Sequence, residues 1–104
     1  MYIAYVHTVY YHLIMLITWD DNKNAANFKK HGIWFEEATT ILFDPMVLSN
    51  INMHLTDDRF EYLGHSDRSR LLYVVTVEKD VDEIRIVSAR KATNGERKTY
   101  EEGI

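Results

Sequence analysis

The stretch Glu83–Glu102, EIRIVSARKATNGERKTYEE, decides how the rest of this chain is arranged. It opens as a strand over Glu83–Arg90, because β-branched residues dominate and the side chains alternate in character. Asn94-Gly95 then marks a turn, and Glu96–Glu102 follows as a short charged helix or tail. Basic residues therefore gather at a strand end, where polar function is common on a rigid scaffold, although an ordinary solvated surface also accounts for them.

Length and composition bound what the chain can do. Its 104 residues suffice for one domain with a modest core, and 46% apolar residues are typical of a globular protein. The lack of cysteine excludes disulfides, cysteine–zinc sites and thiol catalysis. A net charge of −4 argues against strong non-specific binding of nucleic acid. Nine of the twelve basic residues lie in residues 59–104, so we expect any anion site mainly there.

The first nineteen residues are apolar and carry no charge apart from two histidines. A membrane span is possible by length, but polar residues dilute the run, and a signal peptide would need a positive start and a small-residue cleavage site. We therefore expect a cytoplasmic protein with a strand at about Leu13–Trp19. Residues 1–14 are interpreted as an N-terminal extension, with Met15 as an alternative start, and residues 15–104 as the single domain.

Two helices are predicted after this strand. Asp20–His31 begins at an Asp cap and ends before Gly32, which suits a left-handed residue after a helix. We expect Ala26 and Phe28 to pack inward. The polar residues Lys23, Asn27, Lys30 and His31 share the other face, which either contacts phosphates or is merely solvated.

The second predicted helix is Ile33–Phe43, stopped by Asp44-Pro45. Its apolar stripe comprises Phe35, Ala38, Ile41 and Leu42. The residues that follow, Met46–Thr56, are weakly patterned and suit a loop with a short edge strand.

Three strands complete the chain: Arg59–His65, Arg70–Glu78 and Glu83–Arg90. Short polar turns between them indicate an antiparallel meander, and the second strand, apolar on both faces, should be central. The fold class is thus α+β, a small antiparallel sheet of about four strands with two N-terminal helices and a C-terminal helix packed on it.

The residues offer a metal-free chemistry. The five histidines have no spacing typical of a metal site, and no glycine-rich phosphate loop is present, so no cofactor is expected. Arginine, histidine, glutamate and tyrosine together suit RNA cleavage, in which a ribose 2′-hydroxyl attacks the adjacent phosphate. This set alone is weak evidence, because many surfaces hold such residues.

Three groups of motifs follow one another over residues 16–103. The first is Trp19-Asp20-Asp21-Asn22-Lys23 with Asn27, Lys30-His31-Gly32 and Phe35-Glu36-Glu37-Ala38. The second is Asp58-Arg59, Gly64-His65-Ser66 and Arg70-Leu71-Leu72. The third is Arg85-Ile86-Val87-Ser88-Ala89-Arg90-Lys91-Ala92 with Glu96-Arg97 and Tyr100-Glu101. In this order and at this spacing, the three groups resemble the BrnT toxin family.

The resemblance implies a RelE-like fold and a metal-independent ribonuclease toxin of a type II toxin–antitoxin pair, which slows translation. It also implies a BrnA-type antitoxin that binds operator DNA for the complex. The catalytic candidates are His31, Arg59, Arg85, Arg90, Glu96 and Tyr100, and the RNA-binding candidates are Lys23, Lys30, Lys91 and Arg97. The arginines would hold the phosphate, His31 or Glu96 would be base or acid, and Tyr100 would stack on a base or donate a proton. Regular alternation puts Arg85 and Arg90 on opposite faces, so one site needs a strand end or a bulge to use both.

Three departures from the family pattern matter. Asp58 stands where the family usually has Glu, and the acidic balance is unusual for a ribonuclease toxin. Trp34 replaces the Ser of a capping box, which should cost the second helix about 1 kcal/mol. The rival interpretation is a toxin-derived binding module without catalytic activity, which acts as an antitoxin partner and operon co-repressor.

We predict that residues 15–104 fold without residues 1–14, because the family-like pattern begins near Leu16. Thermal melting of the truncated chain beside the full chain tests this. A melting temperature lower by more than about 10 °C, a loss of more than about 1 kcal/mol for a domain of this size, would show that the extension belongs to the core.

Overall fold

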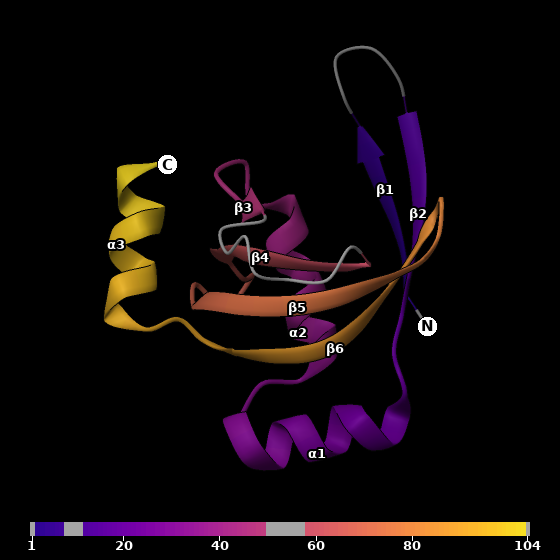
Figure 1. The fold of residues 1–104 in the computed structure, drawn as a ribbon, viewed down its shortest axis with the longest axis horizontal. Coiled ribbons are helices and arrows are strands. Elements are labelled where there is room, and N and C mark those ends of the chain that lie inside the picture. Colours follow the sequence, from indigo (N-terminus) through magenta and orange to yellow (C-terminus); the bar gives the residue numbers. More distant parts are fainter. Residues whose placement is uncertain (1, 8–11, 50–57, 104) are drawn as a thin grey trace.

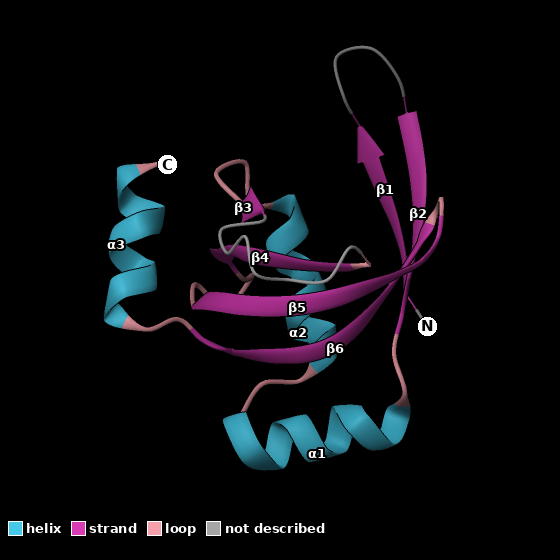
Figure 2. Cartoon of the chain, in the orientation of Figure 1, coloured by secondary structure: helices cyan, strands magenta, loops and turns pink. Residues whose placement is uncertain are grey.

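The computed structural model describes residues 2–7, 12–49 and 58–103, with side chains from residue 16 onward. Figures 1 and 2 show a curved sheet with helices at its face, its edge and one end. The elements in order are β1 Tyr2–His7, β2 His12–Thr18, α1 Asp21–His31, α2 Phe35–Thr39, the 3₁₀ turn η1 Thr40–Phe43, β3 Leu48–Ser49, β4 Arg59–His65, β5 Leu71–Asp80, β6 Glu83–Lys91 and α3 Asn94–Glu102.

The described strands form one six-stranded sheet in the order β1-β2-β6-β5-β4-β3. The predicted meander β4–β5–β6 is confirmed, with β5 and β6 at the centre. The prediction of about four antiparallel strands is wrong in two respects. β1 and β3 add edges, and β2 pairs with β6 in parallel over Leu16–Thr18, which makes the sheet mixed. The pairs between β2 and β6 join residues 67 positions apart, so no local turn signal in the sequence could reveal them.

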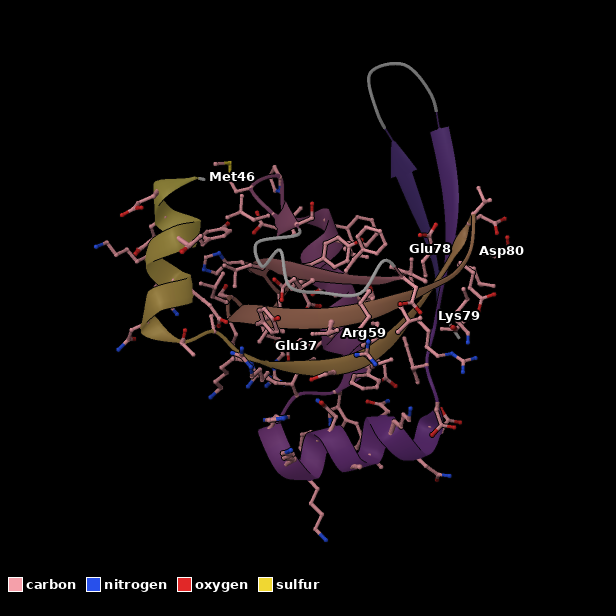
Figure 3. All side chains as sticks on the ribbon, viewed as in Figure 1. Glu37, Met46, Arg59, Glu78, Lys79 and Asp80 are labelled. Carbon is pink, nitrogen blue, oxygen red and sulfur yellow. The ribbon has the colours of Figure 1, made fainter. Side chains whose placement is uncertain are left out.

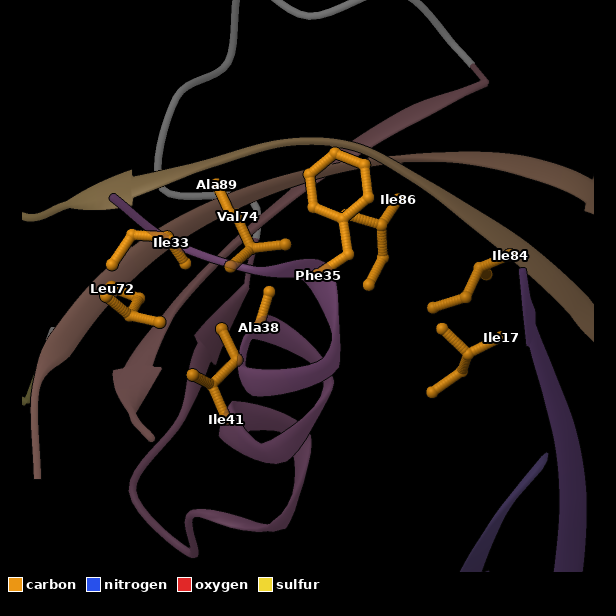
Figure 4. Packing of buried hydrophobic residues seen from close by; sticks show 10 residues of the cluster. All are labelled: Ile17, Ile33, Phe35, Ala38, Ile41, Leu72, Val74, Ile84, Ile86 and Ala89. Atoms are coloured by element: carbon orange, nitrogen blue, oxygen red, sulfur yellow. The ribbon is translucent and has the colours of Figure 1, made fainter. Parts of the chain in front are cut away.

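The core lies between α2 and one face of β5 and β6 (Figure 4). Phe35, Ala38 and Ile41 are fully buried, as predicted for this helix, while Leu42 is half-buried. The predicted single helix over Ile33–Phe43 is instead one α turn followed by the 3₁₀ turn η1. The core residues are Ile17, Ile33, Phe35, Ala38, Ile41, Leu72, Val74, Ile84, Ile86 and Ala89.

Helix α1 packs through amides. Its cap at Asp20 and the left-handed Gly32 are as predicted, but its buried residues are Asn24 and Asn27, not Ala26 and Phe28. The Asn27 amide donates to the carbonyls of Ile33 and Ala89, both at 2.8 Å, and its oxygen accepts from the Ala89 N–H. α1 faces the edge of β6, where backbone N–H and carbonyl groups need hydrogen-bond partners. Polar side chains that point inward from α1 supply these partners, and apolar ones could not.

Asn24 replaces the missing cap of α2. Trp34 makes no side-chain cap bond, as its substitution for Ser predicts. However, the Asn24 carbonyl oxygen accepts from the Phe35 N–H at 2.7 Å, and its amide donates to Glu36 at 2.8 Å. The first turn of α2 is therefore capped from another helix.

Strand β6 contains a bulge. Val75 lies opposite Ser88 and Thr76 opposite Ile86, so Val87 is an extra residue. Ile84 and Ile86 are buried, and the next buried residue is Ala89, three positions later instead of the usual two. Arg85 and Arg90 then lie on the same face of the sheet, the face opposite α2. We call this the arginine face: Arg59, Tyr73, Val75, Val77, Arg85 and Arg90.

Three predictions remain: the edge strand within Met46–Thr56, the turn at Asn94-Gly95 and the N-terminal extension. The short edge strand predicted within Met46–Thr56 is β3, and residues 50–56 of that segment lie outside the described residues. Asn94-Gly95 is not a turn, because α3 already begins at Asn94 with Thr93 as its cap. The predicted extension holds β1 and the first residues of β2, with residues 1 and 8–11 outside the described part.

We expect Asn27→Ala to destabilise the fold by about 3 kcal/mol or more, because it leaves three buried backbone groups without partners, at about 1–3 kcal/mol each. Denaturant unfolding measures the loss. Asn22→Ala, on the exposed side of the same helix, is the matched control and should cost less than about 1 kcal/mol. Equal losses for the two variants would refute the role of Asn27.

Candidate active site

Arg90 is held by three groups at the end of β6. Its Nη1 and Nη2 donate to the two carboxylate oxygens of Glu96 at 2.8 and 2.9 Å, a bidentate pair. Its guanidinium carbon lies 4.2 Å from the centre of the Tyr73 ring. A third hydrogen bond, at 3.2 Å, goes to the Lys91 carbonyl. The side chain is therefore fixed in position with its charge balanced.

Glu96 has two tasks. Its Oε1 also accepts from the Thr93 N–H at 2.9 Å, while the Thr93 hydroxyl accepts from the Glu96 N–H, which closes a capping box at the start of α3. The hydrogen bond from Arg90 lowers the pKa of Glu96, and the same bond raises the pKa of Arg90, with a smaller contribution from the Glu61 charge. Both directions favour the ionised pair.

A cavity of about 420 Å³ opens at this pair. It is lined by Glu61, Tyr73, Arg90, Thr93, Gly95, Glu96 and Thr99, and we call it the Arg90 cavity. Sequence reasoning predicted only Arg90 and Glu96 of these, and the two most consequential members that it missed are Tyr73 and Glu61. Tyr73 belongs to an apolar run and looked like core, and Glu61 gave no signal beyond its alternation in β4. The pairing of Tyr73 with Arg90 across β5 and β6 could have found the first, given the bulge.

Tyr100 lies on α3 but is occupied elsewhere. Its hydroxyl donates to Asp44 at 2.6 Å, and its ring meets His65 edge-on at 5.0 Å. Burial and the bond to Asp44 raise the pKa of Tyr100 to about 12. The residue therefore anchors α3, which has no buried side chain of its own, to the segment after η1.

Arg59 and Arg85 lie further along the arginine face. Both pair with Val77, one on each side, so their backbones are about 10 Å apart, two strand spacings. Figure 3 shows Arg59 in front of the sheet, away from α3. The Nε of Arg85 is buried without a hydrogen-bond partner among the described residues. These two arginines are the second cluster of predicted residues.

The predicted residues of α1 form a third group. Lys23, Lys30 and His31 line a separate hollow of about 240 Å³ with Val87 and Ser88 of β6. No residue lines both this hollow and the Arg90 cavity. The structure thus brings Arg90 to Glu96 but does not bring His31 to them. Lys91 and Arg97 are exposed on either side of the Thr93 cap.

The described residues hold neither a metal-ligand cluster nor a membrane-length helix. No group of three or more His, Asp or Glu side chains in the described ranges is arranged to hold a metal ion. Among the described helices, none has the length and apolar content that crossing a membrane requires.

We expect the stability difference between the native chain and Glu96→Gln to depend on pH. The lowered pKa of Glu96 means that its contribution, about 1 kcal/mol, is present above the usual glutamate value of 4.5 and disappears as pH falls below it. Urea unfolding at several pH values from 7 to 3 measures this. Glu101→Gln, on the exposed side of α3, is the control, and a difference that is independent of pH would contradict the pairing.

Comparisons with known proteins agree with this fold. A crystal structure of the Brucella abortus ribonuclease toxin BrnT superposes with a TM-score of 0.62 at 22% identity, covering 77% of this chain and 99% of that one. No curated protein sequence matches this chain significantly. The family model described as ribonuclease toxin, BrnT, of type II toxin–antitoxin system matches residues 19–96. This match spans most of the chain and all but one residue of the Arg90 cavity, Thr99, so the chain belongs to the BrnT family of type II toxins.

Proposed function

We propose that this chain is a metal-independent endoribonuclease that inhibits translation, with its reaction centre at the Arg90 cavity. The observation that carries the proposal is the position of Arg90, a pre-oriented guanidinium that borders a cavity and shares a sheet face with two further arginines. Arginine binds phosphate oxygens bidentately, as it binds the Glu96 carboxylate here. RNA supplies such phosphates.

The proposed reaction is transfer within the RNA strand. The ribose 2′-oxygen forms a bond to the adjacent phosphorus, the bond from phosphorus to the 5′-oxygen breaks, and a cyclic phosphate and a free 5′-hydroxyl result. Arg90 stabilises the charge that develops on the phosphorane. When a phosphate takes the guanidinium, it displaces Glu96, whose pKa then returns toward its usual range. Glu96 is thereby free to accept the proton of the 2′-hydroxyl.

Arg59 and Arg85 have a different place in this proposal. They flank Val77 at the far end of the arginine face from α3 and suit a neighbouring phosphate of the same strand. We propose four further residues as auxiliary RNA contacts: Lys91 and Arg97, on either side of the start of α3, and Lys23 and Lys30, on α1. His31 and Tyr100 remain candidates for the proton donor, and their present surroundings favour neither.

The partner is proposed from the family. A type II toxin has an antitoxin, here of the BrnA type, and we propose that it covers part of the arginine face and connects the complex to operator DNA. Such a complex works in the cytoplasm. Arg59 is exposed and Arg85 and Arg90 are half-buried, and arginines that a partner can reach make good interface anchors, which supports this placement.

One observation favours the rival function, a binding module without catalysis. Glu96 already balances the charge of Arg90, and the chain carries a net charge of −4, so an RNA phosphate has to compete with a carboxylate. In that case Arg90 serves mainly to hold α3. The two functions differ in what removal of Arg90 does.

We expect Arg90→Ala to lower the cleavage rate per folded molecule about a hundredfold or more, the usual loss for one preorganised donor. Arg90→Lys should restore only part of the rate, because a point charge lacks the bidentate fork. Lys29→Ala, which removes an exposed cation of α1 with no proposed RNA contact, is the control and should stay within about twofold. Single-turnover cleavage of a labelled RNA, with melting curves on the same preparations, decides. Normal activity in folded Arg90→Ala would support the rival.

We expect cleavage to continue in excess EDTA, because arginines supply the charge stabilisation that a metal ion otherwise provides. RNA integrity on a gel, with and without EDTA and after added magnesium, measures this. A loss of activity in EDTA that magnesium restores would refute the mechanism.

A further inference from the structure

Two cavities lie side by side along the part of the molecule formed by α2, η1 and the turn between β4 and β5. One, of about 470 Å³, is lined by Trp34, Glu36, Glu37, Asp67 and Arg68. The other, of about 410 Å³, is lined by Thr40, Phe43, Asp44, His65, Ser66 and Asp67. Asp67 borders both, and we call the two neighbouring cavities together the α2 groove. It lies on the opposite side of the core from the arginine face.

Large apolar side chains stand exposed at the two ends of the α2 groove. At one end Trp34 stacks on Phe28, with ring centres 4.1 Å apart, and both are about 40% exposed. At the other end is Phe43, and Met46, labelled in Figure 3, follows three residues later in the chain. Of the five large apolar residues that are exposed in the described part, Trp34 and Phe43 line the groove and Phe28 stacks on Trp34. Solvent-exposed aromatic pairs of this kind are typical interface anchors.

The fold does not need Trp34 at this position. Asn24 supplies the cap that a Ser in place of Trp34 would give, so the exposed aromatic ring brings no capping bond to α2. The spacing of the two ends also fits a peptide. From Trp34 to Phe43 the helical turns rise about 15 Å, which an extended segment of about five residues or a helix of about ten residues spans.

The groove is rigid. Its floor is the ion pair between Glu37 and Arg70, with an Nε–Oε2 distance of 2.9 Å, joined by the Ser66 hydroxyl at 2.7 Å (Glu37 is labelled in Figure 3). The Asp67 N–H donates to Thr40 across the groove at 2.9 Å. A preformed groove loses little conformational entropy when it binds.

The charge of the groove selects its occupant. Arg70 neutralises Glu37, and Asp44 already accepts from Tyr100 and the His65 N–H. Those two hydrogen bonds leave Asp44 ionised, so the carboxylates of Glu36, Asp44 and Asp67 remain against the single cation of Arg68, a surplus of two negative charges among the lining residues. A Lys or Arg between two apolar anchors complements this pattern, with the cation near the Trp34 ring.

We propose that the α2 groove docks a segment of the antitoxin that carries a basic residue between two apolar side chains. This inference rests on the proposed pairing with an antitoxin, but not on RNA cleavage. The groove is a second contact surface, separate from the arginine face, so the antitoxin has to reach both sides of the core.

The test uses the native chain co-expressed with a BrnA-type antitoxin, and calorimetry on the purified partners. The double substitution Trp34→Ser with Asp67→Lys removes one anchor and reverses one charge, while Ser suits the cap position. We expect the dissociation constant to rise at least tenfold. The matched control, Val81→Ser with Asp82→Lys, makes the same chemical changes on the exposed β5–β6 turn and should stay within twofold.

Three outcomes overturn the inference. The first is an unchanged dissociation constant for the groove variant, and the second is failure of any antitoxin to purify with the chain. The third is a change in self-association of the free chain in the ultracentrifuge with no change in antitoxin binding, which would assign the groove to a second copy. RNA cleavage plays no part in these readouts, so a chain without ribonuclease activity leaves the result interpretable.

Discussion

The amide of Asn27 is the contact on which the rest of the structure depends. β2 covers the edge of β6 only as far as Arg85, and beyond that point the strand would present its backbone groups to a helix. Asn27 takes the place of a neighbouring strand, since it binds both the N–H and the carbonyl of Ala89 and also the carbonyl of Ile33. One side chain thereby joins α1, the approach to α2 and the end of β6. Arg90 follows Ala89 directly, so the same contact fixes the base of the proposed reaction centre.

The bulge at Val87 sets which side of the sheet that centre uses. Without the extra residue, Arg85 and Arg90 would point to opposite faces, and one of them would enter the apolar core. With it, Ala89 remains in the core while both arginines share a face with Tyr73. The bulge therefore places two arginines of one strand on the same face of the sheet, where regular alternation would place them on opposite faces. The cost is a local break in the ladder between β5 and β6, which the core residues on the other face hold together.

Local signals in the sequence predicted the elements well, because caps, turns and alternation act over a few residues. Asp20, Gly32 and the β4–β5–β6 meander all fell where those signals placed them. Interactions between distant segments left no such signal. Both the parallel pairing of β2 with β6 and the amide contacts of α1 join residues far apart in the chain. The polar stripe of α1 was therefore interpreted as a surface, although the amides of Asn24 and Asn27 are buried.

The same limit applies to the site. The sequence pattern placed Arg90 beside Glu96 near a strand end, and the structure joins them. It also grouped His31 and Tyr100 with them. In the fold, His31 lines the separate hollow beside α1, and the Tyr100 hydroxyl donates to Asp44. The need for a bulge was recognised as a condition, but its position at Val87 depends on the register with β5.

The central claim is that RNA binds along the arginine face with a phosphate at Arg90. The most direct test is an NMR titration of the isotopically labelled chain with a short RNA in which every ribose carries a 2′-O-methyl group and so cannot react. We predict saturable shifts in the side-chain signals of Arg90 and Arg85 and in the ring of Tyr73, and smaller shifts in the auxiliary contacts Lys23 and Lys30 on α1. Shifts confined to α1, with the Arg90 signals unmoved, would contradict the account.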